Sequence, residues 1–125
     1  MNKTTNINLQ LTSTIIFIIA TFISLSITYN EKLNIENKKN FYSEQEALDI
    51  SFYNRILFLI AVLISFIVAI DNYLKKETDR EKYKSSLLLL TSLITIVSAL
   101  IILYVSYLNK EESTLTASDT QNTLI

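Results

Sequence analysis

The chain has 125 residues, is half hydrophobic, carries a formal net charge of -1, and contains no Gly, Pro, Cys, His or Trp. Without Gly it cannot form a P-loop or a Rossmann phosphate-binding turn, and without Cys or His it lacks the usual ligands of zinc and iron–sulfur sites and the imidazole base. We therefore expect no catalytic residue, no cofactor and no metal, and the interleaved positive and negative charges argue against a nucleic-acid partner.

The first predicted element is an apolar helix at 9–29, which follows an N-terminal segment at 1–8 and contains no Asp, Glu, Lys or Arg. A membrane-spanning helix needs about 20 mostly apolar residues. The alternative is a cleaved signal peptide, whose best cleavage site would be Ser24-Leu25-Ser26. Because the apolar stretch is longer than a usual signal-peptide core, we expect an uncleaved anchor. An Asn- and Lys-rich loop at 30–42 should follow, since Asn competes with the helix for backbone hydrogen bonds.

The second predicted element, at 43–74, is an amphipathic extension that runs into a second transmembrane helix. Ser43 and Glu46 have the spacing of a capping box, which predicts a helix start there. The uncharged core at 56–70 is only about 22 Å long, so the span must include flanking polar residues such as Arg55 at the headgroup level. A buried core helix of a soluble protein is the alternative, but the chain has too little polar sequence to cover three such helices.

The third predicted element begins in a charged turn and helix start at 75–86 and continues as a transmembrane helix at 87–108. Thr78 and Glu81 form a second capping box. The tail at 109–125 is rich in Ser, Thr and acidic residues, which predicts disorder. The expected fold is therefore all-α: a polytopic membrane protein with three transmembrane helices in an up-down-up bundle.

Amphipathic and basic side chains at the ends of the spans predict where the membrane surfaces lie. The expected interface anchors are Tyr29, Tyr53, Arg55, Tyr73, Tyr83, Tyr104 and Tyr107. Six Lys and Arg residues fall in the N-terminal segment and the second connection, against five on the other side. The second connection is also the denser one, so we expect a bacterial inner membrane protein with a cytoplasmic N-terminus and an external C-terminus.

Small residues recur at every fourth position in each span, and such residues let membrane helices approach closely. The candidate helix-packing residues are Ala20, Ser24, Thr28, Ala61, Ser65, Ala69, Thr91, Thr95 and Ala99. Chance placement is one alternative, and a pore lining is another. The stripes that could line a pore are Thr14, Thr21 and Thr28 in the first span, and Ser92, Ala99 and Ser106 in the third.

The apolar cores of the spans contain no Asp, Glu, Lys, Arg or His, which argues against proton relays and ion-coupled transporters. We expect a small integral membrane protein that acts through helix packing and protein contacts, without catalysis. It would be an accessory subunit, a homo-oligomer or an immunity-type protein, with the lipid bilayer and a second copy or larger membrane complex as partners. The alternative is an oligomeric membrane permeabiliser or channel, holin-like in outline only, because holins typically carry a basic tail and this tail is acidic.

Overall fold

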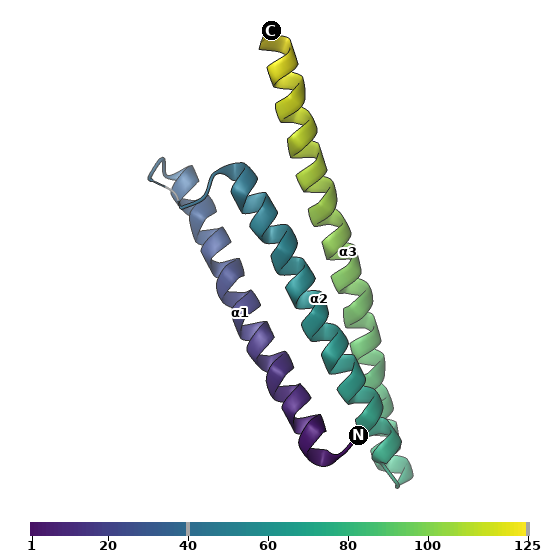
Figure 1. The fold of residues 1–125 in the computed structure, drawn as a ribbon. Coiled ribbons are helices and arrows are strands. Elements are labelled where there is room, and N and C mark those ends of the chain that lie inside the picture. The colour runs from purple at the N-terminus through teal and green to yellow at the C-terminus, as the bar shows by residue number, and fades with distance from the viewer. Residues whose placement is uncertain (40, 125) are drawn as a thin grey trace.

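The computed structural model describes residues 1–39 and 41–124, with side chains described as far as residue 113, and consists of three long helices (Figure 1). They are α1 (Lys3–Ile35), α2 (Glu44–Lys75) and α3 (Asp79–Leu124). Each is long and apolar enough to cross a membrane, and the described residues contain no strand. The predicted all-α fold of three membrane-length helices running up, down and up is therefore confirmed.

The middle helix of the chain, α2, lies between α1 and α3 in Figure 1. α1 and α3 each pack against α2, whereas within the described residues no Cα atom of α1 lies within 8 Å of one in α3. The N-terminus and the α2–α3 turn lie at one end of the molecule, called the lower end here, and the α1–α2 connection lies at the upper end. The three helices thus form an open layer, and the outer faces of α1 and α3 have no neighbour in the chain.

The helix starts are set by side chains that accept hydrogen bonds from free backbone N–H groups. The Asn2 side chain accepts from the backbone N–H of Thr5 at 2.7 Å and begins α1. The Ser43 hydroxyl accepts from the N–H of Glu46 at 3.2 Å, which confirms the predicted start of α2. In the same way, Thr78 accepts from Glu81 at 3.2 Å at the start of α3, so only three residues, 76–78, connect α2 and α3.

The end of α1 lies further along the chain than the predicted loop at 30–42, because the helix continues to Ile35. Asn37 then adopts a left-handed conformation with φ of 57°. The N–H of Lys38 donates to the carbonyl of Leu33 at 2.9 Å, and the N–H of Asn37 donates to the carbonyl of Asn34 at 3.2 Å. This is a Schellman motif, in which Asn occupies the position that Gly usually fills. A chain without Gly therefore ends this helix with its next most suitable residue.

Asn30 is the reason that the helix passes through a segment expected to be a loop. Its side chain is fully buried, and its Oδ1 accepts from the backbone N–H groups of Phe41 at 2.8 Å and Tyr42 at 3.0 Å. Its Nδ2 donates to the Tyr42 carbonyl at 3.2 Å. The amide thus bonds to the returning chain and not to its own backbone, which removes the local competition that disfavours Asn in helices.

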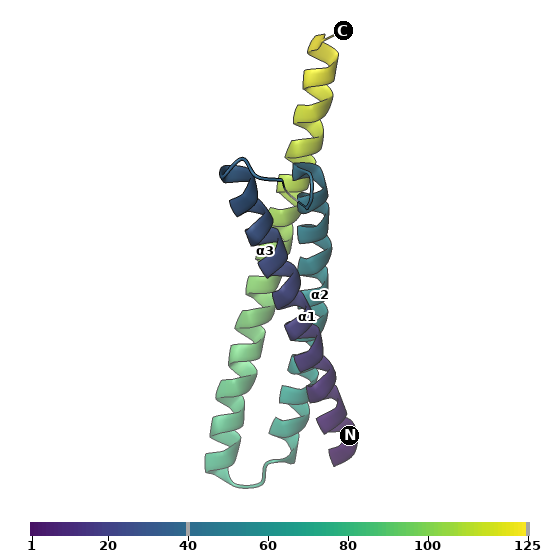
Figure 2. The ribbon, with the colours of Figure 1, turned by 90° about the vertical axis from the view of Figure 1, so that its left-hand side faces the viewer.

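The backbone of α3 is helical to Leu124, whereas the sequence predicted disorder across 109–125. The prediction rested on the polar composition of this segment. The segment contains no Gly or Pro to interrupt the helix that enters it. In both views this part of α3 extends beyond the upper end of α1 and α2 (Figures 1 and 2), and Ile125 lies outside the described residues.

Replacing Asn30 with Ala should loosen the α1–α2 connection, because two backbone N–H groups and one carbonyl lose their buried partner. The expected cost is about 1–3 kcal/mol of unfolding free energy, together with faster tryptic cleavage at Lys38 and Lys39. Reversible unfolding and limited proteolysis of the purified protein in mild detergent would measure both effects. Asn8→Ala is the matched control, since Asn8 is exposed on the same helix. Equal behaviour of the two variants would contradict the role given to Asn30.

Candidate functional site

The helices meet along residues that recur every seven positions. The buried or half-buried members of these series are Asn6, Ser13 and Ala20 on α1, Asn54, Ala61 and Val68 on α2, and Ser85, Ser92, Ala99 and Ser106 on α3. Seven residues of a straight helix return to the same face with a drift of only about 20°. Most members are small or polar, and the candidate site is therefore a set of close helix contacts that contains buried polar groups.

The predicted residues at every fourth position follow the helix contact for only part of its length. On α1, Ala20 is buried, Ser24 is half-buried and Thr28 is exposed. Four residues turn the helix by 400°, so each step rotates the side chain about 40° away from the contact. The third member of the triplet is consequently turned by about 80°. Thr28 therefore lies outside the helix contact of this chain, contrary to the prediction.

Of the other two predicted triplets, the one on α3 shows the same drift and the one on α2 does not. On α3, Ala99 is buried, Thr95 is half-buried and Thr91 is exposed, so Thr91 also lies outside the α2–α3 seam. On α2, Ala61 is fully buried, and Ser65 and Ala69 are half-buried. α2 has a neighbour on each side, which is why all three of its predicted residues retain partial cover.

The lowest contact between α1 and α2 is a network of amide and carboxylate groups. The Asn6 Nδ2 donates to Asp71 Oδ2 at 2.7 Å and to Asn72 Oδ1 at 3.0 Å. The Asn6 Oδ1 accepts from Gln10 Nε2 at 2.6 Å. Lys75 pairs with the same Asp71 carboxylate at 2.9 Å. Asn6, which is buried, thus joins the start of α1 to the end of α2.

The middle contact joins two hydroxyl groups across the helix pair. The Ser13 hydroxyl lies 2.7 Å from the Ser65 hydroxyl and 3.0 Å from the carbonyl oxygen of Ala61. Ser13 is buried, and Ala61 has no exposed surface. The absence of a larger side chain at Ala61 allows the α1 hydroxyl to reach the α2 backbone, which is the arrangement expected of closely packed membrane helices.

The upper contact is centred on Asn54, which is buried on α2. Its Nδ2 donates to the carbonyl of Ala20 at 3.1 Å and to the hydroxyl of Ser24 at 2.9 Å. Between the middle and upper contacts, the rings of Phe17 and Phe58 meet edge to face with centroids 5.4 Å apart. Polar and aromatic contacts thus alternate along the α1–α2 pair.

Lys110 contacts α2 near the upper end of the α2–α3 pair. The Lys110 ammonium lies 3.5 Å from an Asp49 carboxylate oxygen and 4.9 Å from the centre of the Phe52 ring. The Phe52 ring also contacts Tyr107, with centroids 6.3 Å apart. Because Lys110 meets both a carboxylate and an aromatic face of α2, it fixes the register of the two helices at this level.

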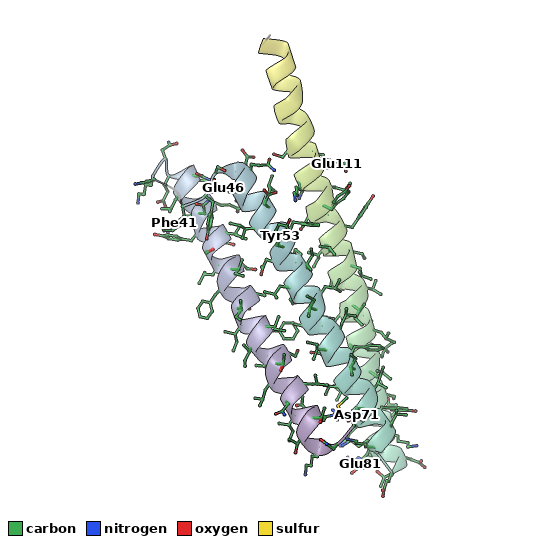
Figure 3. The ribbon with its side chains drawn as sticks, viewed as in Figure 1. Phe41, Glu46, Tyr53, Asp71, Glu81 and Glu111 are labelled. Atoms are coloured by element: carbon green, nitrogen blue, oxygen red, sulfur yellow. The ribbon has the colours of Figure 1, made fainter. Side chains whose placement is uncertain are left out.

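The predicted interface anchors fall at two levels. Tyr29, Tyr53, Tyr83, Tyr104 and Tyr107 are exposed, and Arg55 and Tyr73 are half-buried. Tyr73 and Tyr83 lie toward the lower end and the other anchors toward the upper end; Figure 3 labels Tyr53 there. Tyr53 and Tyr73 are separated by about 30 Å of helix, which is the thickness of the bilayer core. The labelled acidic residues lie near the two ends of the molecule (Figure 3).

Most hydroxyls of the proposed pore stripes bond to their own helix. Thr14 donates to the carbonyl of Gln10 at 2.9 Å, and Thr21 donates to that of Phe17 at 2.8 Å. On α3, the hydroxyl of Ser92 donates to the carbonyl of Leu88 at 3.2 Å. Ala99 is buried and Ser106 half-buried, so this stripe faces α2, the only helix that α3 contacts within the described residues.

Sequence reasoning missed Asn6, Asn30 and Asn54 as parts of the site. A signal for Asn6 was present, because Asn6, Ser13 and Ala20 share a seven-residue spacing, but the segment before residue 9 was treated as lying outside the helix. Asn54 directly precedes Arg55, which the sequence places at the headgroup level. Its partners lie on α1, 30 and 34 positions away in the sequence.

Among the described residues, no group of three or more Asp and Glu side chains is placed to hold a metal ion. No known protein family, curated protein sequence or solved structure matches the chain. The candidate site therefore rests on geometry alone: helix contacts with buried polar groups, between two levels of tyrosine.

The Ser13–Ser65 contact can be tested by chemical cross-linking, since the chain contains no native cysteine. In the double variant Ser13→Cys, Ser65→Cys, the two thiols should form an intramolecular disulfide on mild oxidation, because the native hydroxyls are 2.7 Å apart. Mass spectrometry after thiol alkylation would measure the yield. The control pair Thr21→Cys, Ser65→Cys should remain reduced, because Thr21 is exposed. Free thiols in the first variant would contradict the register of α1 on α2.

Proposed function

We propose that this chain is an integral membrane protein that acts through helix packing and protein contacts within the bilayer, without catalysis. It would act as an accessory subunit, as a homo-oligomer or as an immunity-type protein. The observation that carries the proposal is that polar side chains within the apolar region form hydrogen bonds between helices. Asn54, Ser13 and Ser65 bond across the α1–α2 pair, which is how membrane helices associate when they gain little from the hydrophobic effect.

The outer faces of the layer support the same proposal. Large apolar side chains are exposed along α1 and α3, including Phe22 and Leu25 on α1 and Leu88, Ile94 and Ile101 on α3. A soluble protein of this size would bury such residues, whereas a bilayer covers them. The faces that remain after the α1–α2 and α2–α3 pairs have formed are available to lipid or to helices of another protein.

The membrane orientation follows from the charges at the two ends. The lower end, with the N-terminus and the α2–α3 turn, carries six Lys and Arg residues, and five of them lie in 75–84. Dense positive charge beside a span favours the cytoplasmic side. We infer a bacterial inner membrane protein with its N-terminus in the cytoplasm and its C-terminus outside.

The permeabiliser alternative needs polar surface that faces water in an oligomer. The hydroxyls of Thr14, Thr21, Thr91 and Thr95 donate to carbonyls of their own helices, and such bonds are common in spans that line no pore. This arrangement favours the contact hypothesis over the permeabiliser.

Expression in a bacterial host tests the proposal. The protein should resist extraction from membranes by alkaline carbonate, and reporter fusions should place its two termini on opposite sides. A voltage-sensitive dye should report an unchanged membrane potential, because the proposed helix contacts open no water path. Rapid depolarisation would contradict the proposal. If the double variant Thr91→Val, Thr95→Val suppressed that depolarisation, the result would identify a pore. Extraction by carbonate would contradict membrane integration itself.

A further inference from the structure

A groove follows the C-terminal half of α2 on the face that lies between α1 and α3. It consists of three hollows of about 250, 200 and 160 Å³, all of which are lined by Ser65. Val68 and Asn72 line two of them. The smallest hollow lies between α2 and α3, where Ser85 and Leu88 complete its wall. The groove thus runs from mid-span toward the lower end of the molecule.

Two polar groups in the smallest hollow have no protein partner. Ser85 is only 6% exposed, and its hydroxyl has no hydrogen bond within the part of the chain that the structure describes. Asn72 accepts from Asn6 through its Oδ1, while its Nδ2 has no acceptor among the described residues. Neither the Ser85 hydroxyl nor the Asn72 Nδ2 is fully enclosed by protein atoms, so a group in the hollow can reach both. These two donors therefore suit a bound group that accepts hydrogen bonds.

The depth of these donors suggests what that group is. Ser85 follows Tyr83 by two residues, and Asn72 directly precedes Tyr73. These two tyrosines form the lower level of interface anchors, where aromatic rings meet lipid headgroups. The ester carbonyls of a phospholipid lie just inside this level. They can accept from Ser85 and Asn72, while an acyl chain can occupy the groove above.

Basic side chains lie one turn closer to the lower membrane surface. Lys82 precedes Ser85 by three residues, so it shares that face of α3, and Lys76 follows Asn72 by four residues at the end of α2. Both lysines are exposed, and neither forms an ion pair within the described residues. Basic pockets between transmembrane helices bind anionic lipid headgroups.

We propose that this groove binds one anionic phospholipid, with its phosphate at Lys76 and Lys82, its ester carbonyls at Asn72 and Ser85, and an acyl chain along Ser65 and Val68. The inference rests on the proposed membrane integration. A second copy of the chain is a poorer occupant, because parallel copies would place two positively charged lower ends side by side, where they repel. A lipid of negative charge is attracted to the same end.

The chain has no tryptophan, so a single Leu88→Trp variant can report on the lipid in the groove. Leu88 lines the hollow and is 65% exposed, so a larger ring has room. The purified variant would be reconstituted in phosphatidylcholine vesicles that contain a small fraction of brominated phosphatidylglycerol or brominated phosphatidylcholine. We expect brominated phosphatidylglycerol to quench the fluorescence more strongly. Leu100→Trp, twelve residues further along α3, should show no such preference.

Variants of the two lysines and of Ser85 test which side chains produce the preference for phosphatidylglycerol. Adding Lys76→Gln and Lys82→Gln to Leu88→Trp should weaken phosphatidylglycerol binding about fivefold for each lysine removed, whereas Lys38→Gln and Lys39→Gln, at the other end, should leave it unchanged. Ser85→Ala should also weaken it, and Ser98→Ala, at an exposed serine of α3, should not.

Equal quenching by the two brominated lipids at Leu88→Trp would overturn the lipid site, as would a preference that survives loss of both lysines. An Ala69→Cys variant that oxidises to a covalent dimer would show a second copy in the groove and would also overturn it. Extraction of the protein by alkaline carbonate is a separate result, because it would contradict membrane integration and not the lipid preference alone.

Discussion

The structure depends on one constraint: a polar group inside an apolar layer must find its partner within the protein. The Asn54 Nδ2 and the Ser13 hydroxyl meet this requirement across the α1–α2 pair, with an α1 carbonyl and hydroxyl for Asn54 and an α2 carbonyl and hydroxyl for Ser13. The Asn54 Oδ1 does not, because it is buried without a partner among the described residues. Asn30 meets it at the upper end by holding the returning chain. These bonds require a close approach of the two helices, which fully buried Ala61 permits. Once α1 is fixed on one side of α2, the short α2–α3 turn brings α3 to a different side of α2. α1 and α3 therefore do not pack against each other within the described residues.

The sequence predicts the number, approximate place and order of the helices, because apolar stretches of membrane length and capping residues are local signals. Ser43 and Thr78 start their helices as expected. The contact register was not predicted. Small residues occur at both four- and seven-residue spacings, and only the packed helices show that the seven-residue series stays in the seam while Thr28 and Thr91 rotate out of it. The role of Asn30 was also unpredictable, since its partners, Phe41 and Tyr42, come into reach only after the chain reverses.

The distribution of polar groups connects the fold to the proposed function. Charged residues gather at the two ends, and tyrosines lie just inside them. Many of the hydroxyls between them bond either across the α1–α2 pair or to their own helices. Such a layer leaves two broad apolar faces and a groove on α2. Ser85 and Asn72 each keep an unused donor near the lower surface. A protein that works through contacts with lipid and with other helices would use these features.

The central claim is that hydrogen bonds between α1 and α2 hold the layer together, and a double-mutant cycle on Asn54 and Ser24 tests it most directly. Unfolding free energies would be measured in lipid bilayers or mild detergent for the original chain, Asn54→Ala, Ser24→Ala and the double variant. The bond of 2.9 Å between the two side chains predicts a favourable coupling of about 0.6–2 kcal/mol. Additive losses, with no coupling between the two sites, would contradict the account.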